Sequence, residues 1–163
     1  MANEISKFLL KQFVETTDWV NMYIEPLTDD ELKMEFAPGK SHGVWILGHL
    51  IKCEDDLSLY MGKGSLLYSG YDELFATGSV LQAVECYPPI PLLREQWKAV
   101  LGKNKNIYSQ LTDEELKEPH GKMENPEKDF FKTKERVAML WHLHSMYHAG
   151  QFSALIAKAG KTV

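Results

Sequence analysis

Four segments of the sequence carry apolar residues at helical spacing, and this pattern constrains the fold more than any other feature. They run from about residue 3 to 24, from about 41 to 61, from the proline-rich stretch 87–91 to about Leu111, and from about 133 to 159. Each segment is long enough for about six or seven turns of helix. Because amphipathic helices must bury their apolar faces against one another, the pattern predicts an all-α fold, namely a four-helix bundle.

The long connection between the second and third segments adds to this prediction. Strand signals are poor, and only residues 79–87 show a weak alternation of apolar and polar positions. The connection, residues 62–91, is long enough to cross the bundle, so the helices on either side need not be antiparallel neighbours. Loops of this length often form part of a binding site. The 163 residues are a normal length for one domain, so we predict a single domain over 1–163.

An internal repeat follows the first and third segments. "LTDDELKMEFAPGK" (27–40) and "LTDEELKEPHGK" (111–122) both begin with Leu-Thr-Asp, an acid and Glu-Leu-Lys. Each predicts a Thr or Asp that caps a short helical turn. Two interpretations stay open. The repeat is either a common way to begin a turn or the trace of a duplicated helical hairpin.

Composition and charge exclude several classes of protein. Apolar residues make up 44% and charged residues 25% of the chain, a globular composition. The formal net charge is −5, and no strong basic patch is present, so we expect no nucleic-acid partner. No apolar run approaches the roughly 20 residues that span a bilayer, so no membrane association is expected. The N-terminus reads as a helix rather than a signal peptide, and Cys53 and Cys86 form no CxxC pair. A cytoplasmic protein with reduced cysteines is therefore expected.

Histidines are concentrated in the last helical segment. The chain has six, at positions 42, 49, 120, 142, 144 and 148. His144 and His148 are four residues apart, which places them on one helix face about 6 Å apart along the axis, whereas His142 points away. His42 lies too far along its helix to share an ion with them and is expected near a pocket mouth. His120 lies in a polar loop and is expected to be exposed.

A third histidine completes a candidate metal site. His49 lies on the core-facing stripe of the second segment, and a bundle builds metal sites from inward residues on facing helices. Buried imidazoles are costly unless their nitrogens are bonded, and a metal ion shared by His49, His144 and His148 would satisfy them. Three protein ligands leave an open position, as catalytic zinc sites do. The alternative is that the rings pack against Trp45 or Tyr147 and bond backbone carbonyls.

Three further residues have a functional and a structural interpretation each. Cys53, one turn past His49, is either a fourth ligand that would close the site or a small core residue. Asp56 is a candidate for acid–base chemistry or for contact with a metal ligand, or else a carboxylate in an ion pair or in water. Gln151, one turn past His148, could bond a metal-bound group or a ligand imidazole, or be satisfied by the backbone.

Two motifs resemble a known family. "GVWILGHLIKCEDD" (43–56) resembles the Trp-x-x-x-His segment, and "HLHSMYHAGQFSALIAKAGK" (142–161) the closing His-x-x-x-His-x-Gly-Gln signature, of the DinB/YfiT-like superfamily. The order of features fits over nearly the whole chain. The resemblance implies a four-helix bundle with an up-down-down-up course and a long crossover between its second and third helices. It also implies a divalent metal, zinc or nickel, held at the positions of His49, His144 and His148.

The same resemblance implies classes of function. Characterised branches of the superfamily include thiol-dependent S-transferases, a mycothiol-dependent isomerase and zinc-dependent hydrolases, and most members form homodimers. We therefore expect a metal-dependent enzyme that activates a thiol or water. Its partners would be a small-molecule substrate, which for the thiol-activating reaction includes a low-molecular-weight thiol, and a second copy of the chain. The alternative is a non-catalytic metal-binding or structural dimer.

Overall fold

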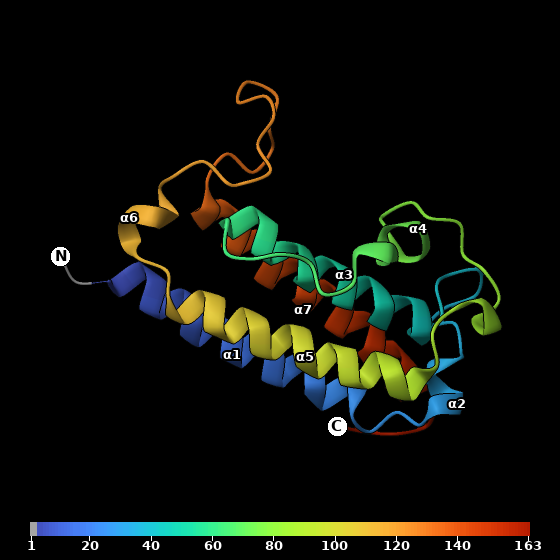
Figure 1. Ribbon diagram of the computed structural model, residues 1–163. Coiled ribbons are helices and arrows are strands. Elements are labelled where there is room, and N and C mark those ends of the chain that lie inside the picture. The colour runs from blue at the N-terminus through green and yellow to red at the C-terminus, as the bar shows by residue number, and fades with distance from the viewer. Residues whose placement is uncertain (1–2) are drawn as a thin grey trace.

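The computed structural model describes residues 3–163 and is all-α, as predicted. Within these residues, four long helices build the molecule, and no named strand is present (Figure 1). They are α1 (Glu4–Ile24), α3 (Gly43–Met61), α5 (Ile90–Ser109) and α7 (Lys134–Lys158). Each lies within a residue or two of its predicted segment. In the described part of the chain, none of the helices combines the length and apolarity needed to cross a bilayer.

The four helices follow an up-down-down-up course. In Figure 1, α1 and α7 run in one direction, and α3 and α5 run in the other. Helix α1 packs on α5 and α7, and α3 packs on the same two helices, so α1 and α3 occupy opposite corners. The segment between α3 and α5 returns along the bundle, as expected for the crossover. The histidine-bearing helices α3 and α7 are therefore neighbours.

The apolar core divides into two clusters along the bundle. On α7, one cluster includes Val137, Ala138 and Trp141, and the other begins at Ala149. The seven residues between Trp141 and Ala149 include both members of the predicted histidine pair. The bundle thus places its polar inward side chains where the two apolar clusters meet.

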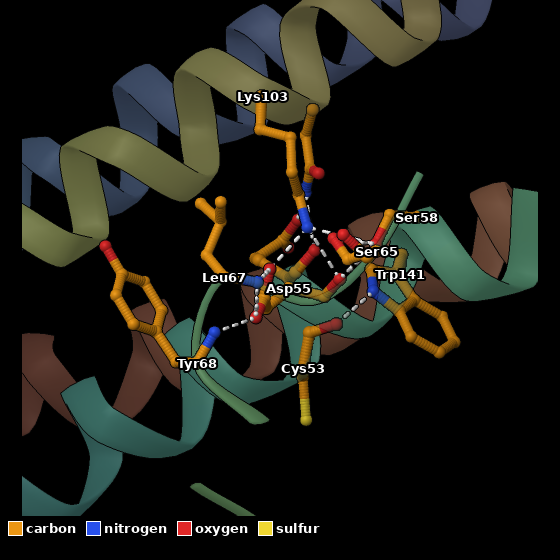
Figure 2. Close-up of polar contacts among 10 residues, drawn as sticks. Cys53, Asp55, Ser58, Ser65, Leu67, Tyr68, Lys103 and Trp141 are labelled. Atoms are coloured by element: carbon orange, nitrogen blue, oxygen red, sulfur yellow. Dashed lines mark hydrogen bonds and ion pairs between the residues drawn. The ribbon is translucent and has the colours of Figure 1, made fainter. Parts of the chain in front are cut away.

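A buried carboxylate ties the crossover to the bundle (Figure 2). Asp55 of α3 accepts hydrogen bonds from the backbone N–H groups of Leu67 and Tyr68, each at 2.8 Å. The Lys103 ammonium of α5 forms an ion pair with the same carboxylate and donates to the Ser58 hydroxyl at 3.0 Å. Because both charges of this pair lie largely out of water, breaking it by removing one partner would cost several kcal/mol. The start of the crossover is fixed by this network.

Short helices in the crossover carry it past α3. They are η1 (Ser69–Tyr71), α4 (Asp72–Phe75) and η2 (Val84–Cys86). The Phe75 side chain is fully buried against Gly48 of α3. A Cβ atom at Gly48 would lie 2.0 Å from the Phe75 ring, so only glycine admits this contact. The close approach brings the backbone of α4 within reach of α3 side chains.

The sequence repeat corresponds to a repeated local structure. Helices α2 (Asp29–Leu32) and α6 (Asp113–Leu116) both begin with a capping box, centred on Thr28 and Thr112, which confirms the predicted caps. An isolated antiparallel bridge closes each following loop, and the two bridges are Glu35–His42 and Pro119–Thr133. Each half of the chain therefore runs long helix, capped turn, bridge, long helix. This order supports the duplicated-hairpin interpretation.

Candidate metal centre

The structure brings the three predicted histidines together. His49 projects from α3, and His144 and His148 project from adjacent turns of α7. The Nε2 atom of His144 lies 3.1 Å from Nε2 of His49 and 3.0 Å from Nε2 of His148. The Nε2 atom of His144 therefore lies within hydrogen-bond distance of the same nitrogen in both other rings.

The opposite nitrogens of two of these rings fix their tautomers. The Nδ1 atom of His49 lies 2.7 Å from the Phe75 carbonyl oxygen, and Nδ1 of His148 lies 2.7 Å from Oε1 of Gln151. Carbonyl and amide oxygens only accept hydrogen bonds, so both Nδ1 atoms must carry the proton and donate it. The Nε2 atoms of His49 and His148 consequently present lone pairs to the centre of the cluster.

This donor set fits a bound cation. In its neutral form, His144 has at most one hydrogen on Nε2, yet two lone-pair nitrogens face that atom at hydrogen-bond distance. One of the two contacts therefore has no hydrogen to bridge its nitrogens. A cation between the rings would instead satisfy all three nitrogens. Imidazole nitrogens suit zinc, nickel and related divalent ions.

Burial keeps the three imidazoles in the neutral form that can bind a metal. It lowers the pKa of His144 to about 3, with a further contribution from the two neighbouring imidazoles. It lowers the pKa of His148 to about 4 and also lowers that of His49. The Trp45 ring stacks on His49, with ring centroids 4.8 Å apart. The ring packing and the carbonyl contact expected under the alternative interpretation are thus present for His49, but neither of them involves its Nε2 atom.

A thiol lies at the edge of the cluster. The sulfur of Cys53 is 3.6 Å from Nε2 of His49, and the ligand atoms of His49, Cys53 and His144 lie within 4.8 Å of one another. These three residues could hold a metal ion. Burial raises the pKa of the Cys53 thiol to about 12, so it is neutral in the absence of a nearby cation.

The family of the chain follows from comparison with known proteins. The family model of the DinB superfamily matches residues 12–152. The chain belongs to the DinB superfamily. No functionally curated protein matches the sequence.

Solved structures share the fold of this DinB chain. YfiT from Bacillus subtilis, described as a probable metal-dependent hydrolase with an unusual four-helix bundle topology, aligns with a TM-score of 0.66 at 16% identity. The alignment covers 99% of this chain and 91% of YfiT. A conserved protein from Enterococcus faecalis aligns with a TM-score of 0.71 at 16% identity, covering 98% and 100%. At this identity, the likeness establishes the four-helix architecture.

The DinB chain places its other histidines in structural roles. His42 caps α3, and its Nδ1 atom accepts a hydrogen bond from Trp45 N–H at 3.0 Å. The expectation that His120 is exposed is wrong. Its side chain is buried and lies 2.9 Å from the Asp129 carboxylate, a partner supplied by its own loop. His142 points away from the metal cluster, as predicted, and packs against Phe13 and Tyr108.

Gln151 and Asp56, the two candidates for a role in catalysis, have different surroundings. Gln151 accepts the His148 hydrogen bond, which is one of the roles considered for it. Asp56 forms an ion pair with Lys52 at 2.9 Å and approaches Lys122 at 3.7 Å. Lys52 is also paired with Asp72 at 2.9 Å. The Asp56 carboxylate is therefore neutralised by lysines on the wall of the site.

A cavity of about 340 Å³ opens beside the DinB histidine cluster. His144 and Cys53 line it, and an ion-paired lysine and carboxylate, Lys52 and Asp56, lie on its wall. Most of the remaining lining is aromatic or apolar, namely Tyr60, Phe130, Phe131, Leu140 and Trp141. The Trp141 indole donates to the Cys53 carbonyl at 2.9 Å and so fixes this wall (Figure 2).

Sequence reasoning missed several of these positions. The Phe75 carbonyl belongs to the backbone, so no residue type in the sequence indicates its role. The two phenylalanines at 130–131, by contrast, are aromatic residues in a polar loop, a pattern that could have indicated a binding role. Glu54 was also missed. It is fully buried and accepts hydrogen bonds from Ser145 at 2.8 Å and Asn104 at 2.7 Å, and burial raises its pKa to about 7. This contact joins α3 to α7 one residue away from both Cys53 and His144.

Proposed function

We propose that this DinB protein is a metal-dependent hydrolase of a small-molecule substrate, with His49, His144 and His148 holding a divalent ion, zinc or nickel. One observation carries the proposal. The Nε2 atoms of His49 and His148 both present a lone pair to the Nε2 atom of His144, which lines a cavity. The description of the fold neighbour YfiT as a probable metal-dependent hydrolase supports the same class.

The chain's own residues hold and orient the reaction site. When bound, a divalent ion with neutral ligands would act as a Lewis acid and lower the pKa of a water or thiol beside it. The Phe75 carbonyl and Gln151 hold two of the imidazoles in the required tautomer. The aromatic cavity wall offers an apolar surface to the apolar part of a substrate. Lys52, held between two carboxylates, places N–H donors on the same wall.

Thiol S-transfer is the second candidate. Neutral protein ligands leave the ion its full positive charge, which favours an anion beside it, and a thiolate satisfies this preference as well as an oxygen anion does. A low-molecular-weight thiol would then be the co-substrate, and the aromatic cavity would hold the electrophile. The same residues serve both reactions, so only an activity measurement separates them.

Metal content tests the proposal first. We expect purified wild-type protein to contain one divalent ion per chain by elemental analysis, and we expect His49→Ala, His144→Ala and His148→Ala to lose most of it. His142→Leu is the matched control, because His142 is equally buried on α7 but faces Phe13 and Tyr108. Circular dichroism verifies that each variant is folded. Equal metal in wild type and His148→Ala would remove His148 from the site.

An activity panel then assigns the reaction. Wild-type protein is assayed against small esters and amides, and against electrophiles in the presence of small thiols. A chelator should abolish the activity, and zinc or nickel should restore it. Ester or amide cleavage supports the hydrolase, and thiol-dependent turnover alone supports the transferase. A stoichiometrically loaded protein that is inactive in both panels would favour the non-catalytic alternative.

A further inference from the structure

Three aromatic rings that line the cavity pack against one another beside the metal centre. They belong to Tyr60 of α3, Trp141 of α7 and Phe131 of the loop between α6 and α7. Their ring centroids lie 4.9 to 5.6 Å apart, and their planes are inclined to one another by 59° to 75°. Trp141 precedes His144 by three residues, or about 4.5 Å along the helix axis. The aromatic part of the cavity therefore begins about one helical turn from a proposed metal ligand.

The Asp129 carboxylate holds the loop that carries the Phe131 ring. Its Oδ1 atom accepts hydrogen bonds from the backbone N–H groups of Phe131 and Lys132, each at 2.8 Å. The same oxygen lies 2.9 Å from Nε2 of the buried His120, whose ring packs against Tyr60 with centroids 5.0 Å apart. Because this wall is fixed before a ligand arrives, little conformational entropy is lost when one binds.

The charged side chains on the cavity wall neutralise one another. Lys52 forms ion pairs with Asp56 and Asp72, each at 2.9 Å. Lys122 approaches the Asp56 carboxylate at 3.7 Å. Two lysines and two carboxylates leave this wall without net charge. A charged substituent placed against the rings would lose its hydration and find no unpaired partner among these groups, which disfavours it.

We propose that the Tyr60, Phe131 and Trp141 rings form an aryl subsite beside the metal ion, and that the substrate is a small ester or amide with an uncharged aromatic group. The inference rests on the proposed function and names its substrate class. Rings inclined in this way offer both edges and faces to a ligand, and an edge-to-face or offset aromatic pair adds about 2- to 12-fold in affinity over burial alone. The cavity volume of about 340 Å³ lies at the small end of the range of ligand pockets, which suits a substrate of this size.

Paired hydroxamates test the subsite without any activity assay. A hydroxamate binds a metal ion through its two oxygens, so benzohydroxamate and acetohydroxamate differ only in the group that they present to the cavity. We expect zinc-loaded wild-type protein to bind benzohydroxamate about tenfold more tightly than acetohydroxamate in calorimetry. It should also bind benzohydroxamate about threefold more tightly than cyclohexanecarbohydroxamate, which has a similar size but no aromatic ring.

Substitution of Phe131 separates the aromatic contact from apolar burial. Phe131→Leu keeps an apolar side chain and should weaken benzohydroxamate binding about threefold or more, with acetohydroxamate binding unchanged. Phe8→Leu is the matched control, because Phe8 is an exposed aromatic residue on α1, outside the cavity, and both affinities should stay at the wild-type values. Circular dichroism verifies that each variant is folded.

Asp129 is a positioning residue in this inference and has its own readout. Asp129→Ala should lower the ratio of benzohydroxamate to acetohydroxamate affinity, because the loop that holds Phe131 loses its acceptor. Asp129→Asn keeps an oxygen at this position and should restore the ratio. A change in metal affinity alone would move both hydroxamates together and leave the ratio constant.

The outcomes distinguish the subsite from the metal centre. Equal binding of benzohydroxamate and cyclohexanecarbohydroxamate, or an unchanged preference in Phe131→Leu, would overturn the aryl subsite and leave the metal centre standing. Failure to bind zinc would contradict the proposed function instead. The subsite is then tested on metal-free protein with uncharged naphthalene-2-methanol. A shift of the Trp141 indole N–H resonance that is smaller in Phe131→Leu would support it, and no shift would overturn it.

Discussion

Two oxygen atoms determine which nitrogen of His49 and of His148 can bind a cation. The Phe75 carbonyl and the Gln151 amide oxygen each accept the Nδ1 proton of a histidine. A neutral imidazole has only one N–H group, so an acceptor at Nδ1 leaves a lone pair at Nε2. Such partners of metal ligands orient the ring and raise its basicity. At the scale of single residues, the site thus depends on groups that would never touch the ion.

Removal of the Gln151 acceptor should weaken metal binding. We expect Gln151→Leu to bind zinc about 10- to 100-fold more weakly than wild type, because the His148 ring loses the partner that selects its tautomer. Gln151→Glu keeps an acceptor at the same place and should stay close to wild type. Competition with a chromophoric chelator measures both affinities. Equal weakening in the two variants would show that the size of the side chain matters rather than its hydrogen bond.

At the scale of secondary-structure elements, a glycine joins the crossover to the metal site. Gly48 lets the Phe75 ring lie directly against α3, and this contact brings the Phe75 carbonyl to His49. A methyl group at position 48 would overlap the ring and push α4 away from α3. Gly102 on α5 is different, because an added Cβ there would meet no atom within 4 Å.

Two alanine substitutions should therefore have opposite effects. We expect Gly48→Ala to destabilise the protein by about 1–3 kcal/mol, through overpacking against Phe75, and to weaken metal binding as well. Gly102→Ala should stabilise it by about 0.5–1 kcal/mol, because alanine loses less backbone entropy in a helix. Urea unfolding measures both changes. A Gly48→Ala variant with wild-type stability and metal affinity would show that α4 can move away from α3 without consequence.

At the scale of the whole molecule, the neighbouring helices α1 and α7 expose many large apolar side chains. Helix α7 has no Asp, Glu, Lys or Arg between Arg136 and Lys158. Leu143, on the outer side of α7, has 57% of its surface exposed to solvent, and Phe8 on the neighbouring α1 has 63% exposed. Other large apolar side chains exposed on the two helices are Ile5, Trp19, Met22, Met139, Met146 and Tyr147. Two adjacent helices about 30 Å long and about 10 Å apart offer an area of the order that a stable dimer buries.

We expect this α1–α7 face to pair two copies of the chain. A second copy presents the same uncharged α7 surface. Two such surfaces can pack against each other because their contact needs no pairing of opposite charges. Light scattering on wild-type protein should give the mass of a dimer, and Leu143→Lys should give that of a monomer. Val80→Lys is the control, because Val80 is 80% exposed in the crossover, away from this face. A monomeric wild type would contradict the expectation, and a dimeric Leu143→Lys would place the interface elsewhere.

Local features of the sequence were enough to predict the long helices and the pair of histidines on α7. The long helices lie close to their predicted bounds because apolar spacing reports the buried face of each segment. The capping boxes at Thr28 and Thr112 also follow from residues three positions apart. His144 and His148 share a face because four residues make about one helical turn. Each of these features depends on neighbours in the chain.

Contacts between distant segments were settled only by the tertiary structure. His49 and His144 are separated by 95 residues, and their rings meet because the up-down-down-up course makes α3 and α7 neighbours. The Phe75 carbonyl reaches His49 only because the crossover packs on Gly48. The burial of His120 likewise depends on how its loop folds back. Helical spacing determines which face a side chain occupies, whereas the packing of the helices determines what that face meets.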